Sequence, residues 1–425
     1  MSFQFLRLIT RAHWLKCHLY LALVLGLFFA VIGLTGSLSV YREALDILFN
    51  PELEIANPHT PKLSLDRILG ELRKAHPNRH GAWTLELPRD KNTAITAWFD
   101  KPRESVDKFY APLMVAVNPY TGEIISNRFW GETFTTALLN LHTDLLMENS
   151  GRYYVAVLGI LLTLSVISGL YLWWPGLAKL RQTFAIRHNA GLMRFLMDTH
   201  RLLGFFSAPF LLLLAFTGFH LAYPNLLETL TASTGMSHGT EGPNVSSTSI
   251  PNNRPISIAE AVLVARGLFP SSEVRRITTP QGDLGTYRVN LRQRHELNQH
   301  HPFTTVWIDR WSGQIKSVNN PNQFSMGQTF TTWQWPLHTG EAFGDTGRLI
   351  WFVLGLLPSF FYVSGVVHWL HRKGLIQDKA IDLPASSRRL STWTIDCGKK
   401  AWRNMQPLLH RGLVKFRHLL SELKE

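Results

Sequence analysis

The stretch KCHLYLALVLGLFFAVIGLTG (Lys16–Gly36) has a second version in the chain, DTHRLLGFFSAPFLLLLAFTG (Asp198–Gly218), and the two align without a gap. Each carries a histidine at its third position, His18 or His200, and each ends in a Thr-Gly pair. Both stretches are apolar and long enough to form a helix across a bilayer, which takes about 20 residues. The sequence therefore predicts a membrane protein made of two copies of one unit.

A second pair of motifs lies later in each copy. LHTDLLMENSGR aligns with LHTGEAFGDTGR, which places His142 on His338. Each motif leads into an apolar run, and a Ser-Gly pair, starting at Ser168 or Ser364, falls at the same position of both runs. The unit is thus a span, an outer domain, an outer histidine and a second span. An even number of crossings separates the copies, which predicts parallel repeats about an axis normal to the membrane.

The loops between the apolar runs carry the orientation signal. Lys and Arg concentrate in the short loop after the second run and in the tail after the fourth, whereas the two long loops mix both signs. Because positive residues stay on the cytoplasmic side, both termini are predicted to be cytoplasmic and the long loops to face outward. The net charge of +13 is then a topology signal, and nucleic-acid binding is disfavoured. The runs are roughly Leu19–Tyr41, Tyr153–Trp174, Leu202–Tyr223 and Leu349–Leu370.

The first run resembles a signal peptide because basic residues precede it, but it lacks a clear small-residue cleavage site. We therefore expect an uncleaved anchor.

The two outer loops repeat a soluble pattern. An amphipathic helix is predicted over 63–77 and again over 256–270, and strand-like alternation follows in each copy. Each loop closes with a turn and a last strand, NPYTGEIIS or DRWSGQIKS, in which Gly122 and Gly313 suit a positive φ. Residues 233–254 are rich in Ser, Gly, Thr, Asn and Pro, which is typical of a flexible linker.

The expected fold class is an α-helical membrane bundle of four transmembrane helices with two small α+β outer domains. Its segments in chain order are the N-terminus and first span (1–41), outer domain 1 (42–135), the outer histidine helix and second span (136–175), the basic cytoplasmic loop (176–199), the third span (200–223), outer domain 2 (224–335), the outer histidine segment and fourth span (336–371) and the basic cytoplasmic tail (372–425).

Histidines recur at matching positions of both copies, on both sides of the membrane. His18 and His200 stand at the cytoplasmic ends of spans one and three, and His142 and His338 stand on the outer side. Ionisable residues at a span are costly and suggest function, although a single interfacial histidine is more often structural. Two imidazoles related by a twofold can bind a metal from opposite sides, as in low-spin haem. A zinc site would want further Cys, Asp or Glu ligands, and none recurs nearby.

Copy two adds two histidines where copy one has leucines. His220 stands at the outer end of span three and His368 at the inner end of span four. They are candidates for axial ligands in place of a symmetric partner, or for a proton route. His13 and His371 are further cytoplasmic candidates. The run HELNQHH (295–301) is expected to be an exposed loop on the outer side.

Other motifs limit the chemistry. Cys17 and Cys397 are far apart, so a disulfide or a cysteine metal site is disfavoured. The sequence has no CxxCH run, so any haem would be bound non-covalently, as b-type haem. The Thr-Gly and Ser-Gly pairs fit the close approach of a porphyrin face, or plain helix packing. GxGxxG, P-loop, flavin and nicotinamide motifs are absent from the sequence, so electrons would come from a separate cytoplasmic donor or from quinol.

The chain resembles the PepSY-associated transmembrane family of bacterial inner membranes, from Arg11 to about Arg372. The resemblance rests on HLYLALVLGLFFAVIGLTGSLSVYREALD, on the two LHT…GR motifs with their Ser-Gly pairs, and on the NPYTGEII ending typical of PepSY domains. It implies that the outer domains are PepSY-like and periplasmic. The better understood members resemble ferric-siderophore reductases that hold haem in the membrane. The resemblance therefore implies a transmembrane oxidoreductase whose substrate is a ferric siderophore or another ferric chelate.

Other functions stay open at this point. A haem electron conduit would serve another periplasmic acceptor, and a non-enzymatic module would use its outer domains to bind peptides or a protease. A permease is disfavoured because charged or broken helices at the membrane midplane are not evident. The sequence assigns no catalytic residue.

Overall fold

The computed structural model describes residues 10–58, 61–176, 184, 186, 191–232, 243, 245–250 and 253–378. Half of the predicted basic loop, much of the predicted linker over 233–254 and the tail after residue 378, with Cys397, lie outside the described residues. The chain divides into two compact units, each described by itself: Met1–Leu172 with Phe206–Tyr362, and Trp173–Phe205 with Val363–Glu425.

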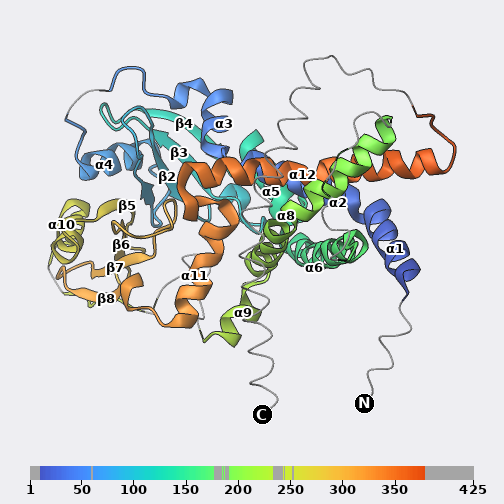
Figure 1. Ribbon diagram of the computed structural model, residues 1–425. Coiled ribbons are helices and arrows are strands. Elements are labelled where there is room, and N and C mark those ends of the chain that lie inside the picture. The colour runs from blue at the N-terminus through green and yellow to red at the C-terminus, as the bar shows by residue number, and fades with distance from the viewer. Residues whose placement is uncertain are drawn as a thin grey trace, which may run out of the picture. The chain divides into compact units, whose positions relative to one another are not determined.

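Four helical segments are long and apolar enough to cross a membrane, which confirms the four predicted spans (Figure 1). Helices are expected here because a bilayer offers no other partner to backbone N–H and C=O groups. The segments are Arg11–Ser39, Glu148–Trp173, Leu192–Ala222 and Glu341–Arg372. They contain α1 (Arg11–Tyr20), a π-helical turn (Leu21–Leu25), α2 (Gly26–Ser39), α6 (Glu148–Trp173), α8 (Leu192–Ala222) and α12 (Gly344–Arg372).

Spans from opposite copies pack at equivalent positions within the first unit. A Cβ added at Gly33 of α2 would lie 2.5 Å from the carbonyl oxygen of Gly355 in α12, so the contact requires glycine. At the aligned positions, a Cβ added at Gly159 of α6 would lie 3.1 Å from the carbonyl oxygen of Ala215 in α8. Small residues let helix backbones approach closely in lipid, where no hydrophobic force drives association. The sequence repeat is therefore also a repeat of helix contacts.

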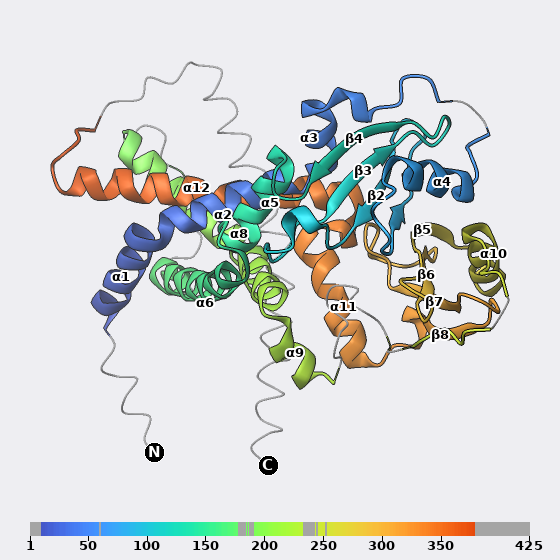
Figure 2. The ribbon, with the colours of Figure 1, turned by 180° about the vertical axis from the view of Figure 1, so that it is seen from behind.

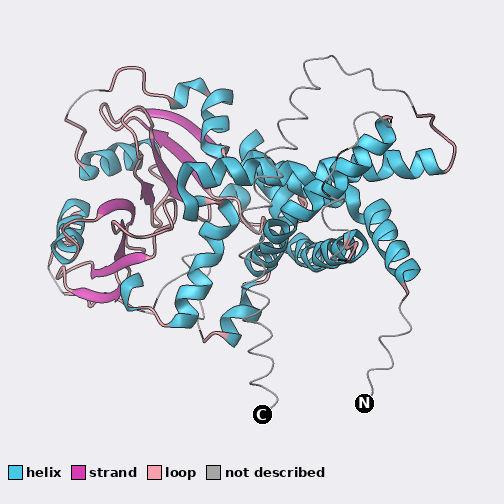
Figure 3. Cartoon of the chain, in the orientation of Figure 1, coloured by secondary structure: helices cyan, strands magenta, loops and turns pink. Residues whose placement is uncertain are grey.

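Apart from its spans, the first unit holds one eight-stranded antiparallel sheet, drawn in magenta in Figure 3. Its strand order is β4-β3-β2-β1-β5-β6-β7-β8. The two halves join where β1 pairs with β5, with Leu85 opposite Ile277. The strands are β1 (Thr84–Glu86), β2 (Ile95–Phe99), β3 (Leu113–Val117), β4 (Ile124–Phe129), β5 (Glu273–Thr278), β6 (Thr286–Arg292), β7 (Thr304–Asp309) and β8 (Ile315–Asn319).

The expectation of two separate outer domains is corrected by this sheet. α4 (Leu65–Ala75) and α10 (Ile258–Leu268) confirm the two predicted amphipathic helices, and both lie on the same face of the sheet (Figure 2). Their apolar sides share one core with strands of both copies, which includes Ile68, Trp83, Ile277 and Val289. Separate halves would each expose an unpaired strand edge and half of this core. The two sequence copies therefore build one domain.

Strand β6 presents polar side chains on the opposite face of the sheet. In β6, Tyr287, Val289 and Leu291 are buried in the core, whereas Arg288 and Asn290 between them are half-buried on the other face. This is the period-2 alternation of a sheet with one apolar face. Short helices connect the sheet to the spans: α3 (Arg42–Phe49), α5 (Phe134–Asp144), α9 (Pro224–Leu230) and α11 (Met326–Thr339), with 3₁₀ turns at Pro51–Leu53, Arg103–Ser105, Pro321–Gln323 and Glu341–Phe343.

Candidate functional site

The structure brings the two outer histidines together. His142 lies on α5 and His338 on α11, each just after its half of the sheet, and their ring centroids are 6.0 Å apart. Two metal–nitrogen bonds of about 2 Å, with roughly 1 Å more from each nitrogen to its ring centre, place two such rings about 6 Å apart. The separation therefore fits a pair of imidazoles that share one metal ion.

Both outer rings are fixed through the same nitrogen. The Nδ1 atom of His142 lies 2.9 Å from the carbonyl oxygen of Ile32, and Nδ1 of His338 lies 2.8 Å from Oγ1 of Thr217. A metal-binding histidine usually donates its second ring N–H to a carbonyl or other acceptor, which fixes the tautomer and the ring orientation. With Nδ1 engaged in this way, Nε2 is the nitrogen that each ring offers to a metal.

The glycine of each Thr-Gly pair makes room for the outer rings. A Cβ added at Gly36 would lie 2.6 Å from Cε1 of His142, and one added at Gly218 would lie 3.2 Å from Cε1 of His338. The structure therefore shows a role for the Thr-Gly motif that the sequence alone did not indicate. Its hydroxyl or a nearby carbonyl binds the imidazole, and its glycine lets the ring lie against the helix.

The same arrangement recurs at His18. Its Nδ1 lies 3.0 Å from Oγ of Ser168 and 3.1 Å from the carbonyl oxygen of Ser165, and a Cβ added at Gly169 would lie 3.1 Å from its Cε1. In the second unit, Nδ1 of His200 lies 2.8 Å from Oγ of Ser364. Every one of the four repeated histidines thus has its Nδ1 hydrogen-bonded.

The additional histidines of copy two differ from these four. His220 is 1% exposed, and neither of its ring nitrogens has a hydrogen-bond partner among the described residues. Nδ1 of His368 is also buried without such a partner there. His13 contacts Thr10, and Nδ1 of His371 lies 3.2 Å from the carbonyl oxygen of Ile376. Within the described ranges, no group of three or more His, Cys, Asp or Glu residues is placed to hold a metal ion.

A cavity of about 920 Å³ opens beside the outer histidine pair. This volume is at the upper end of the roughly 300–1,000 Å³ of ligand pockets. The cavity is lined by His142 and His338, by the outer ends of spans, and by the polar face of the sheet, including Glu86, Arg276 and Arg288. The ligand space and the histidine pair therefore belong to one site within the first unit.

One wall of the cavity is aromatic. The ring of Trp130 lies 5.4 Å from that of Tyr110 and 5.9 Å from that of Trp98, and the Arg42 guanidinium lies 5.2 Å above it. Trp98 donates its indole N–H to Glu86, which also pairs with Arg276. Such a wall can stack a planar ligand and contact its negative charge.

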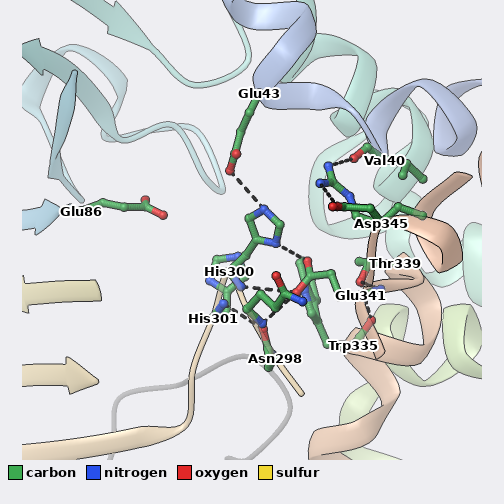
Figure 4. Close-up of polar contacts among 12 residues, drawn as sticks. Val40, Glu43, Glu86, Asn298, His300, His301, Trp335, Thr339, Glu341 and Asp345 are labelled. Atoms are coloured by element: carbon green, nitrogen blue, oxygen red, sulfur yellow. Dashed lines mark hydrogen bonds and ion pairs between the residues drawn. The ribbon is translucent and has the colours of Figure 1, made fainter. Parts of the chain in front are cut away.

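Another wall carries the end of the HELNQHH run, and here the expectation of an exposed loop is corrected. Of its three histidines only His295 is exposed, whereas His300 and His301 are half-buried and line the cavity. The Nδ1 atom of His300 is hydrogen-bonded to the buried carboxylate of Glu341, and Nε2 lies 3.4 Å from Glu43 (Figure 4). Glu341 also accepts the backbone N–H groups of Gln299 and His300.

These contacts change the acidity of the groups. Burial alone would lower the pKa of His300, but the hydrogen bonds and charges of Glu341 and Glu43 raise it above its usual value. Burial also opposes ionisation of Glu43, yet its contacts with His300 lower its pKa to about 2. The imidazole is therefore held protonated between two carboxylates.

The sequence analysis did not identify several residues around this site. The arginines of the two GR pairs each reach the opposite copy: Arg152 donates to the carbonyl oxygen of Leu221 at 3.0 Å, and Arg348 to that of Val40 at 2.6 Å. Glu43 lies within the quoted YREALD segment, but nothing in its local pattern indicates a partner some 250 positions away.

The chain matches a known protein family. A family model described as the PepSY-associated TM region matches residues 15–372, which include all six candidate histidines. The search of curated proteins found no match to the chain.

Proposed function

Because the chain belongs to the PepSY-associated TM family, we propose that it is a bacterial inner-membrane electron-transfer protein that holds two b-type haems and reduces ferric chelates such as ferric siderophores in the periplasm. The observation that carries this proposal is the His142–His338 pair, with rings 6.0 Å apart beside a large cavity. The proposal places both termini in the cytoplasm and the sheet domain in the periplasm, as the distribution of Lys and Arg favours.

The residues that would hold the groups are the repeated histidines. His142 and His338 would supply Nε2 ligands to the outer haem, and His18 and His200 are each a candidate ligand for the inner one. When bound, haem supplies one-electron transfer at a potential set by its axial ligands and surroundings. The chain's own contribution is to fix each ring through Nδ1, which orients Nε2 and keeps it unprotonated.

The cavity supports a chelate as substrate. Its aromatic wall and its arginines suit an anionic, partly planar ligand, and its volume admits a molecule of siderophore size. Fe(II) binds hard oxygen donors more weakly than Fe(III), so one-electron reduction releases the metal.

Haem content and spectra of purified variants test the ligand assignment. His142→Ala and His338→Ala should each remove the same half of the haem absorbance, whereas His18→Ala should leave that half intact. His295→Ala, an exposed residue of the cavity-side loop, is the matched control and should keep the full spectrum. A colourless wild-type protein would contradict the haem assignment and favour a peptide-binding module.

Reaction with iron tests the activity. Reduced protein in detergent should be reoxidised by a ferric hydroxamate while a ferrous-specific dye traps Fe(II). A general conduit for another acceptor predicts slow and unselective oxidation instead. Haems that stay reduced with every ferric chelate offered would end the reductase proposal and leave the haem proposal standing.

A further inference from the structure

We propose that His300 is a proton donor in the outer cavity, giving its Nε2 proton to an oxygen atom of the iron chelate as that oxygen leaves the reduced metal. This inference rests on the proposed function, because it assigns a catalytic residue to the same cavity. It goes beyond that function because reduction alone does not require any protein acid.

The geometry makes Nε2 the nitrogen from which a proton can leave. Nδ1 is engaged with Glu341, which is 5% exposed and also binds two backbone N–H groups of the loop. Nε2 faces Glu43 at 3.4 Å, a long contact to a side chain that is 58% exposed. A ligand oxygen in the cavity can therefore replace Glu43 at Nε2, whereas it cannot replace Glu341 at Nδ1.

The surrounding charges keep a proton on the ring. Glu43 on α3 and Glu341 at the start of the fourth span face it directly. The raised pKa of His300 keeps the imidazolium present at neutral pH. Other charged or titratable groups near this cluster are His301, Arg42, Arg89 and Arg348. The two carboxylates outweigh the more distant arginines at the ring itself.

Only copy two has this acid. When NPYTG is aligned with DRWSG, His300 falls on Phe109 and His301 on Tyr110, and all four residues line the cavity. The segment before the third strand of each copy thus contributes aromatic rings to the cavity in copy one and imidazoles in copy two.

The proposed step balances in atoms and charge. Under the proposed function, the electron for the Fe(III) chelate would come from the haem that His142 and His338 would hold. As a hydroxamate or catecholate oxygen leaves Fe(II), its bond to iron breaks, an O–H bond forms and the Nε2–H bond of His300 breaks. The neutral imidazole is then reprotonated from water at the exposed Glu43 side. General acids of this kind contribute roughly 10²–10⁴-fold to rate.

The test compares two oxidants of the reduced, haem-loaded protein over a range of pH. A ferric hydroxamate needs a proton to release its iron, whereas ferricyanide accepts an electron without one. For the wild type, oxidation by the hydroxamate should slow as pH rises through the pKa of His300, while oxidation by ferricyanide should not. His300→Gln should slow only the hydroxamate reaction, by about tenfold or more, and remove its pH dependence.

Glu43→Gln provides a second variant that leaves the loop anchored by Glu341. It should move the pH dependence of the hydroxamate reaction to lower pH, because one of the two carboxylates that hold the proton is lost. Glu52→Gln, an exposed residue just after α3, is the matched control and should behave as the wild type.

Binding supplies a readout without electron transfer. The gallium(III) hydroxamate has the same charge and cannot be reduced, and its affinity should be nearly the same for the wild type and His300→Gln. An affinity loss as large as the rate loss would overturn the proposal and make His300 a binding residue.

The pH profiles separate the two ideas. An unchanged pH profile in His300→Gln, with iron still reduced, would overturn the proton step alone. Wild-type protein that no ferric chelate reoxidises would overturn the proposed function and the proton step together.

Discussion

At the scale of single residues, the Thr-Gly and Ser-Gly pairs have the clearest physical explanation. Their spacing could be read from the sequence, since the pairs recur in both copies. Their purpose could not, because His142 contacts Gly36 across more than 100 positions and from a different helix. The sequence offered porphyrin contact or helix packing, and the structure shows an imidazole against Gly36, Gly169 and Gly218, whereas Gly365 has no such neighbour.

Gly36→Ala should remove the outer haem without unfolding the protein. The new Cβ would lie 2.6 Å from Cε1 of His142, so the ring must move off its hydrogen bond with Ile32. We expect a loss of roughly half of the haem absorbance, as for a lost axial ligand. Gly204→Ala is the control, since a Cβ there meets no atom within 4 Å. Equal spectra for the two variants would show that the contact between residue 36 and the His142 ring tolerates a methyl group.

His220→Leu separates a ligand from a buried polar residue. The wild-type ring is 1% exposed, and both nitrogens lack a partner within the described chain, which is an unfavourable arrangement for a polar group. Leucine stands at the aligned position of copy one. We therefore expect the free energy of unfolding to stay unchanged or to rise by about 1 kcal/mol. If haem is lost instead, His220 is a ligand that the symmetric pairing omits.

At the scale of secondary-structure elements, the sequence predicted the helices α4 and α10 well. It did not predict that both pack on one sheet. Both begin after a serine N-cap, Ser64 or Ser257, and both have an apolar stripe, which are local signals. The strand pairing of β1 with β5 lies outside any local pattern, because hydrophobic alternation does not say which strand lies next to which. The sequence therefore predicted two correct halves and the wrong number of domains.

Asp66→Ala should weaken the contact between the halves. Asp66 lies in the first turn of α4, but its carboxylate accepts the backbone N–H groups of Ile258 at 3.0 Å and Ala259 at 3.3 Å, at the start of α10. Loss of such a cap costs about 1 kcal/mol. Chemical denaturation of the variant measures the cost, with Glu52→Ala as an exposed control. A change no larger than the control's would mean that water caps α10 equally well.

At the scale of the whole molecule, one sheet and one core predict cooperative behaviour of the two copies. Leu85 of β1 is fully buried and lies opposite Ile277 of the other copy. Leu85→Ala should cost about 2–5 kcal/mol, and hydrogen exchange should accelerate in β3 and in β6 alike. Independent domains would instead lose protection in the copy-one strands only.

The exposed rings of the short helices predict contact with lipid. Phe134 of α5 and Phe330 of α11 occupy aligned positions, are 55% and 45% exposed, and lie on helices that precede an apolar span. Spin labels at Phe134→Cys and Phe330→Cys, in reconstituted vesicles, should be reached by oxygen rather than by a water-soluble relaxation agent. A label at Leu263→Cys, on the sheet-covering helix α10, should show the opposite preference. Access of the water-soluble agent to the first two labels would contradict the prediction.

The joining of both copies in one polypeptide has a consequence for how the cavity can evolve. A symmetric dimer of single-copy chains must place identical residues on its two walls, because each substitution appears twice. Here Phe109 and Tyr110 stand on one side while His300 and His301 stand on the other. Fusion of the copies thus permits a substitution on one wall to be selected for a new task while the opposite wall keeps the old one.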